Sequence, residues 1–121
     1  MTENFDQELI PFIEAVTSKK AKDVVALDVQ NLTSYTDYLI VASGTSTRQA
    51  SSIAENIKIE LSKVGIKPLS IEGLKEGQWV LLDYGNVIIH IFIEETRLFY
   101  DIEGLWADAK KLSIDSFIQE D

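Results

Sequence analysis

Short apolar runs separated by polar segments predict three strands in the first part of the chain. Residues 23–29 (DVVALDV) and 38–43 (YLIVAS) are rich in Val, Ile and Leu, and PLSIEG at 68–73 is a shorter run of the same kind. No charged residue interrupts 38–43, which is the pattern of a strand buried on both faces. The polar stretch EGLKEGQ at 72–78 predicts a loop before the next apolar run.

A helical period replaces the strand pattern after residue 46. Ser46 and Gln49 have the spacing of a capping box at its start, and Gly65 is typical of a helix stop. The apolar positions that share one face of this long helix are Ala50, Ile53, Ala54, Ile57, Leu61 and Val64.

A second amphipathic helix is predicted near the N-terminus. Asn4 and Gln7 again have capping-box spacing. Pro11 lies inside the helical stripe, and because proline lacks an amide hydrogen and crowds the preceding turn, we expect either a kink or a later helix start. The stripe consists of Phe5, Leu9, Phe12, Ile13 and Val16.

Two apolar runs around Tyr84, Gly85 and Asn86 predict a β-hairpin over residues 79–92 (WVLLDYGNVIIHIF). With a loop of two or four residues, alternate side chains of the two strands share a face. The aliphatic face, expected to pack on the core, consists of Val80, Leu82, Ile89 and Ile91. The opposite, mixed face consists of Trp79, Leu81, Asp83, Ile88, His90 and Phe92.

Helical spacing returns after the hairpin, at Leu98, Phe99, Ile102, Leu105 and Trp106. Gly104 is expected to be a weak point or a cap of this helix. The scattered apolar residues of 110–121 predict one more helical turn or a mobile tail. Helices that alternate with strands and end in a hairpin predict an α/β fold, a single domain with a mixed β-sheet flanked by helices. We place this domain at residues 1–109 and a C-terminal tail at 110–121.

Composition sets the character of the surface. The chain has 121 residues, enough for one domain, and its 20 Asp and Glu against 11 Lys and Arg give a net charge of -9. Such a surface repels phosphate backbones and attracts basic partners, although solubility alone explains the same balance. Cysteine is absent, which excludes disulfides and thiolate sites.

Targeting signals are not apparent in the sequence. Its apolar runs fall short of the roughly 20 residues of a membrane helix. The segment MTENFDQELIPF lacks both the basic start of a secretory signal and the arginines of a transit peptide. We expect a cytoplasmic protein without membrane attachment.

The turn Ser43-Gly44-Thr45-Ser46 follows a strand and opens the long helix, so its amides and the helix dipole, with Arg48 nearby, form a weak phosphate site. A serine-rich helix cap explains the same residues, and neither GxxxxGK[ST] nor GxGxxG occurs. A nucleotidyltransferase would also need paired carboxylates to hold its metal ions, and the sequence has no Asp-x-Asp pair.

His90 is the single histidine and would be the natural general base. Without a second histidine or a cysteine, a zinc site is disfavoured, and no GxSxG elbow marks a serine nucleophile. We therefore assign no catalytic residue, metal or cofactor. His90 is better interpreted as a contact or a support for Trp79.

The mixed face of the hairpin has the composition of a half-exposed surface that meets a partner, because it combines tryptophan, acid, imidazole and phenylalanine. The alternative is that helices cover both faces and leave the polar atoms at the sheet edge.

Several long stretches resemble the ribosomal silencing factor family, also called the Iojap or RsfS family, over residues 20–109. They are DVVALDV, SYTDYLIVASGTSTRQ, PLSIEG, WVLLDYGNVIIHIF and EETRLFYDIEGLWADA. The resemblance implies an α/β fold similar to nucleotidyltransferases without their catalytic carboxylates. It implies a translational repressor, not an enzyme, that binds the large ribosomal subunit through its protein fourteen. Occupancy of that site would sterically block joining of the small subunit and lower translation under nutrient limitation.

The resemblance also implies partners and site residues. Family members are commonly homodimers when free, and we expect contact with protein rather than sequence-specific binding of nucleic acid. Trp79 matches the motif tryptophan before the hairpin, and His90 matches its histidine. The other matched positions, expected at or beside the docking surface, are Asp83, Tyr84, Arg97, Tyr100, Leu105 and Trp106. Gly104 departs from the family, which carries a longer polar side chain there, so an early end of the last helix is expected.

Two other interpretations remain open at this point. One is a nucleotide-binding or nucleotidyltransferase-like enzyme that uses the Ser43-Gly44-Thr45-Ser46 turn. The other is a homodimeric scaffold with a different protein partner.

Overall fold

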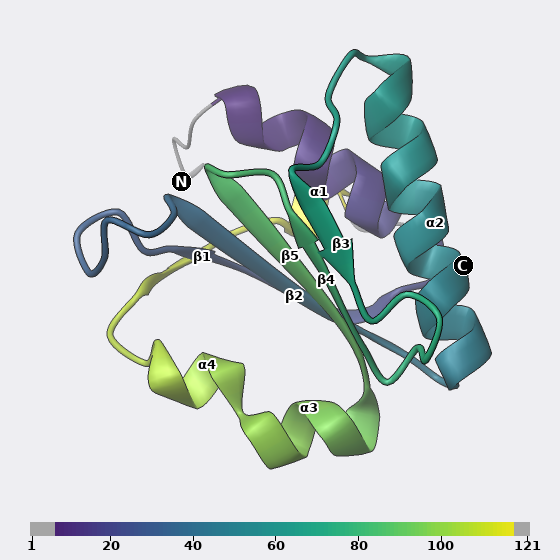
Figure 1. The fold of residues 1–121 in the computed structure, drawn as a ribbon. Helices are drawn as coiled ribbons and strands as arrows, with labels where there is room; N and C mark the ends of the chain where they lie inside the picture. The colour runs from purple at the N-terminus through teal and green to yellow at the C-terminus, as the bar shows by residue number, and fades with distance from the viewer. Residues whose placement is uncertain (1–6, 118–121) are drawn as a thin grey trace.

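The computed structural model describes residues 7–117 and contains a six-stranded sheet in the order β3-β4-β5-β2-β1-β6 (Figure 1). Strands β2 and β5 run parallel and the other neighbouring pairs are antiparallel. The predicted α/β class with a mixed sheet is therefore confirmed. The strands are β1 (Lys22–Asp28), β2 (Tyr38–Gly44), β3 (Ser70–Glu72), β4 (Trp79–Asp83), β5 (Val87–Ile93) and β6 (Lys110–Leu112).

Helices cover both faces of the sheet. Figure 1 shows α1 and α2 on one face and α3 and α4 on the other. The helical elements are η1 (Gln7–Leu9), α1 (Ile10–Thr17), α2 (Thr47–Lys63), α3 (Glu94–Tyr100), α4 (Ile102–Leu105) and η2 (Asp115–Phe117). Between residues 7 and 117, no helix has the length and apolar character needed to span a membrane.

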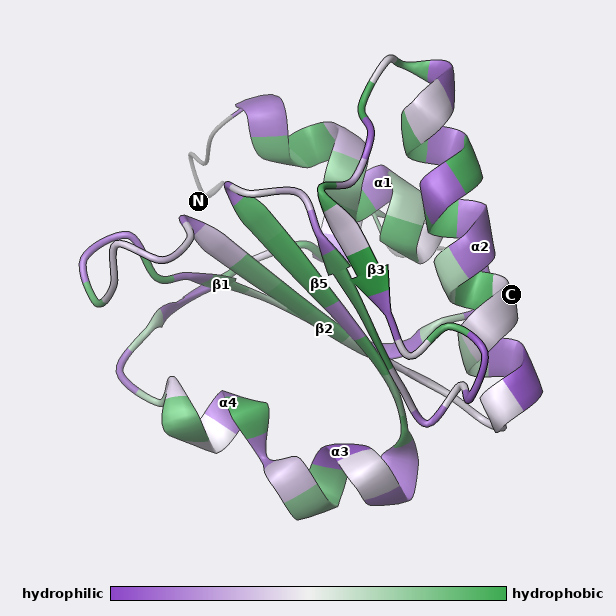
Figure 2. Ribbon diagram, viewed as in Figure 1, coloured by the Kyte–Doolittle hydropathy of each residue, from purple (hydrophilic) through white to green (hydrophobic). Residues whose placement is uncertain are grey.

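The main core lies between the sheet and the pair α1 and α2, and a smaller cluster of Leu27, Val29, Leu39 and Ile88 lies on the opposite face. Strands β2 and β5 are almost continuously hydrophobic (Figure 2), as expected of adjacent parallel strands with both faces covered. The prediction that 38–43 is buried on both faces is confirmed, since every residue of β2 is buried.

Helix α2 begins and ends where the sequence predicts. The Ser46 hydroxyl accepts the Gln49 amide hydrogen at 3.1 Å. The Gln49 side chain accepts hydrogen bonds from the amide and hydroxyl of Thr45 rather than from the Ser46 amide. The chain turns at Gly65, whose φ of +81° is in the left-handed region that favours glycine.

Helix α1 begins at Ile10, after the short helix η1. Pro11 lies in its first turn, where an amide hydrogen would have no helical partner. Of the two alternatives for Pro11, the later helix start is confirmed. The proposed Asn4 cap and Phe5 lie outside the described residues.

The hairpin has the predicted register, with Trp79 opposite Phe92 and Leu81 opposite His90. Its aliphatic face is completely buried under α1 and α2. On the mixed face, the residues of β4 are half-buried, whereas those of β5 are buried, including His90 at 7% exposure. The expectation of a half-exposed mixed face thus holds for β4 only. Helix α3 follows β5 directly and packs against β5 and β2, so it covers the mixed face at β5.

The last predicted helix is broken at Asp101, not at Gly104. Asp101 has a left-handed φ of +47°, ends α3, and caps α4 by accepting the Gly104 amide hydrogen at 3.1 Å. A Cβ atom on residue 104 would collide with the Asp101 carboxylate. A residue with a side chain would not fit beside this cap, so the cap depends on Gly104. The helix breaks three residues before Gly104, and α4 then ends at Leu105, so the expected early end of the last helix is confirmed.

The C-terminal segment joins the sheet. Strand β6 pairs with β1, with Leu112 opposite Ala26, and both Leu112 and Ile114 are buried in the main core. The expected helical turn is present as η2, but the strand before it was not predicted. Three residues are too few to show a period of two, so this pairing depends on the open edge of β1.

Candidate docking surface

An aromatic cluster forms where β4, β5 and α3 meet. The Trp79 ring stacks on Phe92 with centroids 5.0 Å apart and planes at 27°, and it lies 4.6 Å from the Tyr100 ring. The strand register places Trp79 opposite Phe92, and the short path through α3 returns Tyr100 to the same face. Three predicted site residues, Trp79, His90 and Tyr100, are brought together here.

His90 binds Trp79 directly. The indole N–H of Trp79 donates to Nδ1 of His90 at 3.0 Å. The two residues are diagonal neighbours across the hairpin, a separation that long side chains span. Because Nδ1 accepts, the proton of the neutral ring is on Nε2. Burial lowers the pKa of His90 to about 4, so the ring is neutral at pH 7. This geometry fits a support for Trp79 better than a general base.

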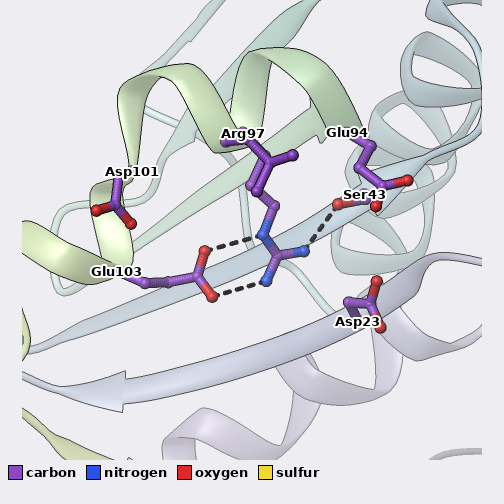
Figure 3. Close-up of a pocket in the computed structure, with 7 residues that line it drawn as sticks. Asp23, Ser43, Glu94, Arg97, Asp101 and Glu103 are labelled. Carbon is purple, nitrogen blue, oxygen red and sulfur yellow. Dashed lines mark hydrogen bonds and ion pairs between the residues drawn. The ribbon is translucent and has the colours of Figure 1, made fainter.

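Arg97 is buried and forms a clamp between three elements (Figure 3). Its Nε and Nη2 donate to the two carboxylate oxygens of Glu103 at 2.9 and 3.0 Å, and Nη1 donates to the Ser43 hydroxyl at 2.8 Å. The hydrogen bonds from Arg97 lower the pKa of Glu103. Arg97 therefore ties α3 to β2 and α4, and its charge is neutralised within the fold. Glu103 was not predicted as a partner, because only the break at Asp101 brings it back to Arg97.

The surface of α3 and α4 exposes large apolar side chains. We define the α3–α4 surface as Leu98, Phe99, Tyr100 and Leu105, which are 74%, 80%, 47% and 74% exposed. Leu98, Phe99 and Leu105 belong to the helical spacing predicted from the sequence, which the break at Asp101 interrupts. Trp106 packs against the smaller core cluster and is half-buried.

Asp83 and Tyr84 lie at the hairpin turn, at the opposite end of β4 from Trp79. The Asp83 carboxylate accepts the Gly85 amide hydrogen at 2.8 Å and so stabilises the turn. Tyr84 is buried on the side of α1, where its ring meets Phe12 edge-on at 5.3 Å. The structure does not bring Tyr84 to the aromatic cluster. Among residues 7–117 its hydroxyl has no hydrogen-bond partner, and burial raises its pKa to about 12.

The Ser43-Gly44-Thr45-Ser46 turn is occupied by internal contacts. Ser43 accepts a hydrogen bond from Arg97, Ser46 caps α2, and a Cβ atom on Gly44 would lie 2.8 Å from the Ala50 amide nitrogen. Glu94 and Glu95 line the pocket beside this helix start and oppose an anion there. Among the residues that the structure describes, no group of three His, Asp or Glu side chains could hold a metal ion.

The fold is that of a small α/β protein, and it is similar to solved structures. A crystal structure of a protein from Chromobacterium violaceum aligns with a TM-score of 0.81 and 38% identity, covering 92% of each chain.

The chain belongs to the ribosomal silencing factor family. The family model described as "Ribosomal silencing factor during starvation" matches residues 2–121. A ribosomal silencing factor of Chromobacterium violaceum is 40% identical over 98 residues, 81% of this chain and 80% of that protein. One of Bacillus subtilis is 37% identical over 101 residues, 84% of this chain and 86% of that protein. The family predicted from the sequence motifs is confirmed, and it is a family of silencing factors rather than of known enzymes.

Proposed function

We propose that this protein binds the large ribosomal subunit through its protein fourteen and sterically blocks joining of the small subunit. Translation would thereby be lowered when nutrients are limiting. Membership of the silencing factor family supports a ribosomal role. The observation that carries the choice of surface is the exposure of Leu98, Phe99, Tyr100 and Leu105 beside the half-buried Trp79.

The α3–α4 surface offers exposed apolar side chains whose burial favours docking. Burying a side chain the size of Leu or Phe stabilises a complex by roughly 1.5–3 kcal/mol before the costs of association. Tyr and Trp are also enriched among the residues that contribute most to binding at protein interfaces. We propose that Trp79, Tyr100 and Leu105 contact the partner, and that His90, Arg97 and Trp106 hold these residues in place.

Charge supports a protein partner with basic character. The chain has a net charge of -9, and the exposed Glu94 and Glu95 begin the helix that carries Leu98 and Phe99. The Arg97 cation is paired with Glu103, so it offers no free charge to phosphate. We therefore propose contact with the protein component of the subunit rather than sequence-specific contact with RNA. We also propose that the protein acts in the cytoplasm.

Co-sedimentation with purified large subunits tests this proposal, together with a subunit-joining assay. Trp79→Ala should abolish binding and restore joining while the fold persists. Ile59→Ala is a matched control, because Ile59 is 54% exposed on α2, on the opposite face of the sheet. If Trp79→Ala bound with unchanged affinity, the docking surface would be misplaced.

We also propose that the free protein is a homodimer. Apolar residues exposed on a free subunit favour self-association until a partner covers them. Sedimentation equilibrium of the purified protein should give twice the mass of the chain. Phe99→Ala would show whether the dimer and the ribosome use the same surface, since a shared surface predicts that both associations weaken.

A further inference from the structure

We infer that His90 is a positioning residue for docking: by accepting the Trp79 indole N–H, it fixes the orientation in which that ring meets a partner. The inference rests on the proposed function, because it assigns Trp79 to the interface. His90 itself is 7% exposed and lies on the covered inner strand β5, so it acts through Trp79.

Stacking alone does not define the orientation of an indole. The Trp79 ring contacts Phe92 and Tyr100, and a half-turn about its Cβ–Cγ bond leaves the plane of the ring unchanged. The two flipped states differ in where the N–H points. The hydrogen bond of 3.0 Å to Nδ1 of His90 selects one of them.

The acceptor is itself held in place. The His90 ring is stacked parallel to Phe92, with planes at 9° and centroids 5.9 Å apart. Burial disfavours the charged imidazolium, so Nδ1 keeps its lone pair at neutral pH. Because the Trp79 N–H is used internally, a partner meets the ring of Trp79 and not its donor. Loss of the acceptor would leave the donor without a partner and both ring states populated.

A pair of substitutions separates the hydrogen bond from simple packing. Asn places its Oδ1 close to the position of Nδ1, whereas Leu fills similar space without an acceptor. With isolated bacterial large subunits as the probe, His90→Leu should bind about tenfold more weakly, the effect of one lost hydrogen bond. His90→Asn should bind nearly as well as the unaltered protein. Thermal melting at pH 7 checks that both variants fold.

A double-mutant cycle gives the decisive result. Trp79→Phe keeps a stacked ring but removes the N–H, so adding His90→Leu to Trp79→Phe should cause no further loss of affinity. An equal loss in both backgrounds, or a His90→Leu variant that binds normally, would overturn the inference.

Nuclear magnetic resonance provides a readout that does not depend on the ribosome. The Trp79 indole proton should exchange slowly with water in the unaltered protein and in His90→Asn, and quickly in His90→Leu. Rapid exchange in the unaltered protein would overturn the inference about His90 and leave the proposed function standing. Slow exchange without any binding to large subunits would overturn the proposed function, and with it the docking role of His90.

Discussion

His90 should make the stability of this fold depend on pH between about 4 and 6.5. Burial lowers its pKa from 6.5 to about 4 in the folded state. The unfolded chain therefore takes up a proton first as the pH falls, and the folded state loses stability through this range. The contribution of His90 is complete above pH 6.5 and is lost as the pH approaches 4. At 1.36 kcal/mol for each pKa unit, the full effect is about 3 kcal/mol, of which about 2 kcal/mol is lost between pH 7 and pH 5.

Replacement of His90 by Asn tests this reasoning, because Asn keeps an acceptor for Trp79 but does not titrate. Urea unfolding would be measured for both proteins at pH 7 and pH 5. The chain has only one histidine, so no other imidazole titrates in this range. The carboxyl groups contribute equally to both proteins, and their effect cancels in the difference. The unaltered protein should lose about 2 kcal/mol more than His90→Asn. Equal losses would refute the assignment of a buried, neutral imidazole.

Four further substitutions test the packing, each by urea unfolding at pH 7. Gly44→Ala should destabilise the fold by about 1–3 kcal/mol, because the added Cβ atom meets the backbone of α2; an unchanged midpoint would contradict this close approach. Arg97→Met should cost about 2 kcal/mol through the unpaired Ser43 and Glu103, and a neutral effect would show that the clamp adds nothing. Tyr84→Phe should be neutral or stabilising by up to about 1 kcal/mol, since the hydroxyl that it removes has no partner within the described part of the chain; a clear loss would reveal one. Leu112→Ala should lower the free energy of unfolding by about 2–4 kcal/mol if β6 is integral to the core. An unchanged free energy of unfolding would support the prediction that residues 110–121 are a tail.

The sequence by itself determined the local elements and their faces. Helix α2 extends between the predicted cap at Ser46 and the stop at Gly65, because both signals act within one turn of the backbone. The hairpin register followed from the period of two, which separated the aliphatic face from the mixed face. Motifs within these elements were also sufficient to predict the family.

Only the tertiary structure decided which of these faces remain open. Ser43 and Arg97 are 54 positions apart, and no local period relates them. The left-handed turn at Asp101 redirects α4, returns Glu103 to Arg97 and leaves Leu98 and Leu105 exposed. Tyr84 faces α1 rather than Trp79, and β6 forms only because β1 offers an edge. Such outcomes depend on contacts between distant segments, whose free energies are set by burial and pairing in the assembled fold rather than by the residues nearby in sequence.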